Sequence, residues 1–236
     1  MTAVGVTGAS GHLGRFLVPY LWERGHVVTP IGRTWDDGVD IDVLIHLAAP
    51  DHRDEDAIRD FAKFNERIAR WQGYTGVPVI NTGTWWQYAG PEAESLSYTA
   101  LKRDQMATLH GSTLIPFSIY SDRLRDGRGF IPQLVAHMQG RTRLAGASRQ
   151  LRDWIHVADV CAAYRAALVA PAGVYEVSTG LQLSPMELVV SLTGAKVDEY
   201  AETPNCAPRY RHGHVPGWAP RVDILHRVRQ LSTRAA

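Results

Sequence analysis

The chain has 236 residues, of which 45% are hydrophobic and 21% charged, as in a soluble globular protein of one domain or one domain with a small lobe. A formal net charge of +1 gives no electrostatic case for binding nucleic acid or an anionic membrane. No apolar run approaches the roughly 20 residues that span a bilayer, and two cysteines indicate neither a disulfide framework nor a zinc site.

The N-terminal stretch predicts a strand, a glycine turn and a helix. A buried strand over 3–6 is followed by Gly8, Gly11 and Gly14, and a helix opens near Leu13. In a dinucleotide site the first glycine permits a tight turn, the second lets the backbone approach a pyrophosphate, and the third lets the helix pack closely on the strand. The helix N-terminus offers free N–H groups to phosphates. The stretch therefore predicts dinucleotide binding. Because the chain enters this strand directly, without a signal peptide, we also expect a cytoplasmic protein.

The rest of the chain alternates apolar strands with amphipathic helices. The expected strands are 26–31, 43–47, 77–82 and 112–120, and the expected helices are 54–71, 98–110 and 131–138. Such alternation implies right-handed crossovers and a parallel sheet covered on both faces. We predict an α/β protein with a Rossmann-type doubly wound parallel sheet and a small C-terminal substrate-binding lobe. The dinucleotide-binding core would comprise 1–117 and 156–180, and the lobe 118–155 and 181–236.

The end of the second predicted strand indicates which dinucleotide binds. An acidic side chain there would hydrogen-bond the ribose hydroxyls of NAD, whereas an arginine accommodates the 2′-phosphate of NADP. Arg33 follows the strand, and no acid occurs before Asp36. These residues favour NADP, with Arg33 as the phosphate partner, and leave NAD open.

Two further segments predict proton-transfer chemistry. Tyr98 and Lys102 are four residues apart on an expected helix, so both side chains project from one face. A nearby cation favours the phenolate, which would make Tyr98 a better acid–base group near neutral pH. Thr84 lies just beyond the carboxyl end of the strand over 77–82, where α/β sheets form ligand sites, and could supply a hydroxyl beside the phenol.

Together these residues resemble the extended short-chain dehydrogenase/reductase family, also known as the NAD-dependent epimerase/dehydratase family, which acts largely on nucleotide sugars. The similarity runs through most of the chain as several ordered segments. These are the glycine turn, Ile45–Ala49, Thr84–Tyr88, the Tyr98/Lys102 pair, Phe130–Pro132, Arg152–Asp159 and Val174–Gly180.

The resemblance implies a role for each matching residue. Tyr98 would be the general acid/base, Lys102 would hold the nicotinamide ribose, and Thr84 would hydrogen-bond the reacting oxygen. The cofactor-binding set would be Gly8, Ser10, Gly11, His12, Leu13, Gly14, Arg33, Leu47, Ala48, Ala49, Thr82, Tyr98 and Lys102. The substrate-binding set would be Thr84, Trp85, Trp86, Ser118, Arg152 and Arg211, with both arginines on the diphosphate of a nucleoside-diphosphate sugar and no metal.

The sequence departs from the family pattern at four places. The segment between the second strand and Ile45 is too short for the usual third strand and its helix, which puts the adenine contacts there in doubt. Ser118 stands where many relatives have an Asn, and His214 replaces an Asp beside Arg211. Trp85-Trp86 stands where related dehydratases carry the Asp-Glu pair that performs the elimination.

The last departure argues against dehydration and leaves three functions. The leading one is NADPH-dependent reduction of the 4-keto group of a nucleoside-diphosphate 4-keto-6-deoxyhexose, as in deoxysugar ketoreductases of the CDP-abequose synthase type. The second is a nucleotide-sugar 4-epimerase with tightly bound NAD. The third is a non-catalytic NADP-binding protein.

Relatives often dimerise through helices like those beginning at Asp54 and Tyr98. We expect one of Trp85 and Trp86 to touch ligand, His156 to be a hydrogen-bonded core residue, and His212 and His214 to be loop residues.

Overall fold

The computed structural model describes residues 1–35, 37–123, 129–200 and 206–233. Its centre is a six-stranded sheet in which every neighbouring pair is parallel. The strand order is β2 (Val27–Ile31), β1 (Ala3–Thr7), β3 (Val43–His46), β4 (Val79–Thr82), β5 (Gly111–Pro116) and β8 (Val174–Val177). The Rossmann-type fold class predicted from the sequence is confirmed.

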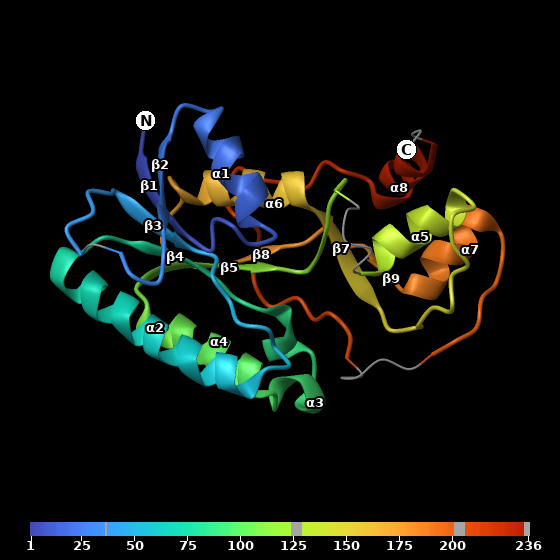
Figure 1. Cartoon of the computed structure of the whole chain (residues 1–236), viewed down its shortest axis with the longest axis horizontal. Coiled ribbons are helices and arrows are strands. Elements are labelled where there is room, and N and C mark those ends of the chain that lie inside the picture. The colour runs from blue at the N-terminus through green and yellow to red at the C-terminus, as the bar shows by residue number, and fades with distance from the viewer. Residues whose placement is uncertain (36, 124–128, 201–205, 234–236) are drawn as a thin grey trace.

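Helices cover both faces of this sheet (Figure 1). One face carries α1 (Gly14–Trp22) and α6 (Val157–Ala167), and the other carries α2 (Glu55–Thr75) and α4 (Ser97–Thr108). A strand that is covered on both faces has apolar side chains at successive positions, and all four residues of β3 are buried. The strands therefore read in the sequence as continuous apolar runs.

Local signals at both ends define the long helix α2. The Asp54 carboxylate accepts the N–H of Ala57 at 2.9 Å and caps the first turn. The helix extends past the predicted end at residue 71 and includes Gly73. It ends at Gly76, whose φ of 69° is the left-handed conformation that glycine adopts most easily.

The connection from β2 to β3 contains no helix in its described residues, 32–35 and 37–42, in agreement with the predicted shortening. A side chain of α2 holds the connection in place instead. The Arg67 guanidinium donates to the carbonyl oxygens of Arg33 and Trp35 and to the Asp37 carboxylate, and it lies 4.2 Å from the Trp35 ring centroid. The Trp35 ring packs edge-on against Phe64 of the same helix.

A second sheet corrects the single strand predicted over 112–120. That segment forms two strands in different sheets, β5 and β6 (Ser118–Tyr120). Proline has no N–H to continue the hydrogen-bonded ladder, and β5 ends at Pro116. The second sheet joins β6 to β7 (Arg152–His156) in parallel and β7 to β9 (Gln182–Leu183) in antiparallel orientation.

Three helices pack beside this second sheet and share a hydrophobic core with it (Figure 1). They are α5 (Phe130–Met138), α7 (Pro185–Thr193) and α8 (Ile224–Thr233). Two short helices, η1 (Trp85–Tyr88) and α3 (Pro91–Glu94), follow β4. The division into a core and a lobe at the predicted boundaries stays a prediction. In the described residues, no helix is both long and apolar enough to cross a membrane.

Candidate functional site

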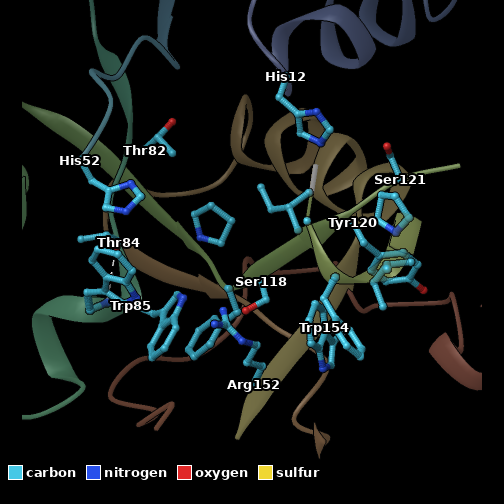
Figure 2. Close-up of a pocket in the computed structure, with 18 of the residues that line it drawn as sticks. His12, His52, Thr82, Thr84, Trp85, Ser118, Tyr120, Ser121, Arg152 and Trp154 are labelled. Atoms are coloured by element: carbon cyan, nitrogen blue, oxygen red, sulfur yellow. Dashed lines mark hydrogen bonds between the residues drawn. The ribbon is translucent and has the colours of Figure 1, made fainter. Parts of the chain in front are cut away.

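A cavity of about 960 Å³ opens where several parallel strands of the main sheet end. His12 follows β1, His52 follows β3, Thr84 follows β4 and Phe117 follows β5, and all four line the cavity. Trp154 of β7 contributes from the second sheet. Figure 2 shows His52 and Thr84 on one side, Trp154 on the opposite side, and His12 far from Arg152. This is the edge at which doubly wound α/β folds place their ligands.

Two glycines of the turn at this edge, Gly8 and Gly14, have no room for a side chain. Gly8 has a φ of +67°, and a Cβ there would lie 2.7 Å from the backbone nitrogen of Ala48. A Cβ on Gly14 would lie 2.2 Å from the Gly8 carbonyl oxygen. The N–H of Gly11 donates to that same oxygen at 2.9 Å. These contacts make a bare backbone cradle at the start of α1, which fits the pyrophosphate of a dinucleotide.

A buried network of hydrogen bonds lies next to this cradle and connects the end of β1 to the end of β3. His46 lies in β3, with Nδ1 2.6 Å from the Thr7 hydroxyl and Nε2 3.0 Å from Asn65 Oδ1. Burial and the nearby charge of Lys102 lower the pKa of His46 to about 3, so its ring is neutral. Because Asn65 Oδ1 only accepts, Nε2 donates to it and Nδ1 accepts from Thr7. The Thr7 oxygen in turn accepts the N–H of Ala48 at 3.2 Å and holds the residues after β3 against the turn.

Thr84, Tyr98 and the two tryptophans lie along one wall of the cavity. Thr84 caps η1 and is buried, with its hydroxyl oxygen accepting from the N–H of Trp86. The Trp85 ring stacks on Phe117 at 6.1 Å and belongs to a hydrophobic cluster. The Trp86 ring is partly buried and packs edge-on against Tyr98. Both tryptophans line the cavity, so the expectation that one of them touches ligand stays a prediction.

Burial of Lys102 and Tyr98 shifts their pKa values in a way that the sequence did not predict. The Lys102 side chain is fully buried, and its Nζ donates to the Thr82 carbonyl oxygen at 2.9 Å and to Gln105 Oε1 at 3.1 Å. This ammonium lies 5.9 Å from the Tyr98 ring centroid. Burial lowers the pKa of Lys102 to about 7 and raises the pKa of Tyr98 to about 12. The structure thus stabilises the neutral phenol, a proton donor, and not the phenolate that the sequence spacing suggested.

The two predicted phosphate-binding arginines differ in position. Arg152 lines the cavity at the start of β7, and its guanidinium lies 5.8 Å from the Trp154 ring centroid. Arg211 is exposed and is not part of the lining. The buried Glu176 carboxylate accepts the backbone N–H groups of Arg211 and His212, which attaches this segment alongside β8.

The three histidines that the sequence analysis set apart from catalysis all have side-chain partners. His156 is buried, and its Nε2 lies 3.0 Å from Asp122 Oδ1. His212 Nε2 lies 2.9 Å from the Tyr88 hydroxyl, and His214 Nε2 lies 3.1 Å from the Ser178 hydroxyl.

The cavity brings together eight of the predicted site residues: His12, Thr82, Thr84, Trp85, Trp86, Tyr98, Ser118 and Arg152. The other predicted residues lie outside its lining: Gly8, Ser10, Gly11, Leu13, Gly14, Arg33, Leu47, Ala48, Ala49, Lys102 and Arg211. The roles assigned to both groups stay predictions. Arg33 is exposed at the end of β2, and Asp36, the next acid, lies outside the described residues.

Several lining residues were not predicted. Arg15, His52, Phe117, Tyr120, Ser121, Arg123, Trp154 and Tyr200 belong to this set. His52 follows the carboxyl end of a predicted strand, and that position alone could have suggested it. Arg15 lies in α1 and Phe117 follows β5, whereas Tyr120 and Trp154 come from the second sheet.

The lining is one-sided in charge. Among the described residues that form it, Arg15, Arg123 and Arg152 are cationic and none is Asp or Glu. A guanidinium forms paired hydrogen bonds to phosphate oxygens. The cavity therefore suits an anionic ligand, although the whole chain is almost neutral.

Comparison with known proteins agrees with this geometry. The Epimerase family, described as the NAD dependent epimerase/dehydratase family, matches residues 88–178. The matched segment includes Tyr98, Lys102 and Arg152. No curated protein matches the chain in sequence.

Three solved structures illustrate the similarity in fold. The Bordetella bronchiseptica enzyme WbmG in complex with NAD and UDP is 20% identical, with a TM-score of 0.74, over 97% of this chain and 92% of that one. TunA, an NAD-dependent NDP-hexosamine 5,6-dehydratase, is 18% identical, with a TM-score of 0.77, over 98% and 97%. The Thermus thermophilus UDP-glucose 4-epimerase complex with NAD is 20% identical, with a TM-score of 0.72, over 98% and 97%.

At these identities the solved structures show the shared fold. The fold and the matched segment together support the prediction of an enzyme of the NAD-dependent epimerase/dehydratase type.

Proposed function

We propose that the protein is a nucleotide-sugar ketoreductase that uses NADPH to reduce the 4-keto group of a nucleoside-diphosphate 4-keto-6-deoxyhexose. The observation that carries this proposal is one cavity that joins Thr84 and Tyr98 with Arg152 and has no Asp or Glu among the described residues of its lining. The Thr84 and Tyr98 hydroxyls can polarise and protonate a carbonyl oxygen, and the Arg152 guanidinium can bind a diphosphate.

The chemistry assigns a task to each of these side chains. A reduced nicotinamide cofactor supplies the hydride. The Tyr98 phenol, whose pKa is raised to about 12 by burial, holds the proton that the carbonyl oxygen accepts. Thr84, buried at the start of η1, orients that oxygen through its hydroxyl. Lys102 positions the end of β4 by donating to the Thr82 carbonyl.

Dehydration is disfavoured by the residues that follow Thr84. Trp85 and Trp86 have no ionisable group with which to remove a proton from carbon, and Trp85 is packed into a hydrophobic cluster. A ketone reduction needs only the hydride and one proton, which this wall can deliver. The segment that contains these residues also resembles deoxysugar ketoreductases of the CDP-abequose synthase type.

The NADP preference rests on Arg33. This residue is exposed at the end of β2, and its carbonyl oxygen is held by Arg67, so its place in the loop is defined. An arginine at this position accommodates the 2′-phosphate of NADP.

The test is oxidation of NADPH by the purified protein with 4-keto-6-deoxyhexoses on TDP, CDP, UDP and GDP. We expect turnover with at least one nucleotide and a loss of about 10²- to 10⁴-fold in kcat for Tyr98→Phe. Failure to oxidise NADPH with any of these ketosugars contradicts the proposal.

One observation favours a second function, nucleotide-sugar 4-epimerisation. The Thermus thermophilus UDP-glucose 4-epimerase shares the fold over nearly the whole of both chains and is complexed with NAD. An epimerase retains NAD through turnover, so NAD bound to the protein as purified would favour this function over the reductase. The homodimer and the cytoplasmic location expected from the sequence stay predictions.

A further inference from the structure

His52 lies beside the proposed proton donor, and the sequence analysis gave it no role. Its ring centroid lies 6.2 Å from that of Tyr98 and 5.1 Å from that of Trp86, edge-on in both contacts. It lines the same cavity (Figure 2). The His52 side chain is 40% exposed, so one part of the ring faces solvent while another contacts the wall that holds Tyr98.

Reduction of a ketone leaves Tyr98 without its proton after each turnover. Lys102 is poorly placed to return one. It is fully buried, and its Nζ donates to the Thr82 carbonyl and to Gln105. Two titratable groups are seen in contact with His52, Asp51, whose Oδ1 lies 3.7 Å from Nδ1, and Tyr98 itself. Imidazole is the side chain that exchanges protons most readily near neutral pH.

We propose that His52 is the proton relay between solvent and Tyr98. The inference rests on the proposed ketone reduction. The carbonyl carbon gains a hydride and the carbonyl oxygen gains the phenol proton of Tyr98, which leaves a phenolate. The imidazolium of His52 gives its N–H proton to that phenolate, and the neutral ring takes a proton from water. The sum is one hydride and one solvent proton added to the C=O bond, with both side chains restored.

The kinetic test compares the wild type with His52→Phe, which keeps a ring against Trp86 and Tyr98. His110→Phe, at an exposed position outside the cavity lining, is the matched control. For His52→Phe we expect a kcat lower by about tenfold or more at pH 7, a pH profile of kcat that differs from that of the wild type, and partial recovery with added imidazole. A kcat and pH profile equal to those of the wild type overturn the proposal.

A spectroscopic test needs neither substrate nor cofactor. The imidazole Cε1–H signal of His52 is titrated by NMR in the wild type and in Tyr98→Phe, which keeps the aromatic ring and removes only the hydroxyl. A shift in the His52 midpoint between the two proteins supports contact with that hydroxyl, and identical midpoints overturn the relay.

The two tests distinguish failure of the proposed relay from failure of the proposed reductase function. Absence of NADPH oxidation in the wild type would overturn the reductase function, whereas the NMR titration still decides the contact on which the relay depends. If His52→Phe fails to fold, as judged by its melting temperature, His52→Gln takes its place in the kinetic comparison.

Discussion

Position 14 has no room for a side chain. In Gly14→Ala the new Cβ would lie 2.2 Å from the Gly8 carbonyl oxygen and 2.6 Å from the Ala9 backbone. We expect the variant to lose about 1–3 kcal/mol in the free energy of unfolding and to bind a dinucleotide more weakly, because the turn must open. Urea unfolding and a dinucleotide titration measure the two effects.

Gly73 provides the matched control. A Cβ there meets nothing within 4 Å, and the residue lies inside α2. Gly73→Ala should therefore raise the free energy of unfolding by about 0.5–1 kcal/mol. Equal changes in the two variants would show that crowding does not set the glycine requirement at position 14.

Lys102 makes the stability of the protein depend on pH. Its pKa falls from the ordinary 10.5 to about 7 in the folded chain because it is buried. Between those pH values the unfolded chain binds a proton that the folded chain does not, so this residue makes stability rise with pH. In Lys102→Met the rise should be missing, a difference on the order of a few kcal/mol between pH 7 and pH 10. Urea unfolding across this range measures it.

Lys63→Met serves as the control for that measurement, since Lys63 is an exposed residue of α2 paired with Asp60. Its stability should follow the pH profile of the wild type. A Lys102→Met profile parallel to that of the wild type would mean that Lys102 keeps its ordinary pKa in the folded chain.

At the scale of elements, one carboxylate links the helix α8 to the start of α6, in addition to the hydrophobic core that α8 shares with α5 and α7. Asp122 accepts hydrogen bonds from the Arg227 guanidinium of α8 and from His156, the N-cap of α6. Burial alone would raise the pKa of Asp122, but these hydrogen bonds lower it overall. A carboxyl group with a lowered pKa contributes stability above its ordinary pKa of 3.8, and this is lost as the pH falls through the folded-state value.

We therefore expect Asp122→Asn to be less stable than the wild type at pH 7 and to expose α8 to exchange, because Arg227 loses its ionic partner. The difference should vanish once the pH is low enough to protonate Asp122 in the folded protein. Hydrogen exchange of α8 at pH 7 and unfolding below pH 4 test the two parts. Thr233→Ala, an exposed change on the same helix whose hydroxyl donates to the Gln230 carbonyl within α8, should leave the exchange of α8 close to that of the wild type.

The helices and strands also show which features hydrophobic periodicity predicts and which it does not. Apolar runs and amphipathic spacing predicted β1 to β5 of the main sheet and the helices α1, α2 and α4. They did not predict α6 or β8, although Val174–Gly180 was among the segments that resemble the family. Periodicity did not show that the strand over 112–120 divides at Phe117, because both halves are apolar and the division depends on pairing with β8 and β7.

At the scale of the whole molecule, an anionic ligand should stabilise the fold by binding the cavity lined by Arg15, Arg123 and Arg152. A nucleoside diphosphate at 100 times its Kd adds about 2.7 kcal/mol to the free energy of unfolding, which appears as a higher Tm. We expect Arg152→Ala to lose most of this increase while keeping the increase caused by NADP. Thermal unfolding with UDP, CDP, TDP and GDP measures it.

Arg141→Ala is the control, since Arg141 is exposed and outside the cavity lining. It should keep both increases in Tm. An unchanged nucleotide effect in Arg152→Ala would place the diphosphate elsewhere in the molecule.

The sequence alone determined the Rossmann-type fold and the glycine turn, because hydrophobic periodicity and glycine spacing are local properties that act on neighbouring residues. It also indicated Thr84 and Tyr98 from their places after a predicted strand and on a predicted helix, and Arg152 from the resemblance to the family. Only the tertiary structure decided how these residues work together. Burial raises the pKa of Tyr98, and the Lys102 ammonium donates a hydrogen bond to the Thr82 carbonyl at the end of β4. The His52 ring packs against the Tyr98 ring. Desolvation and contact depend on what the rest of the chain packs around a residue, and spacing along the sequence does not contain that information.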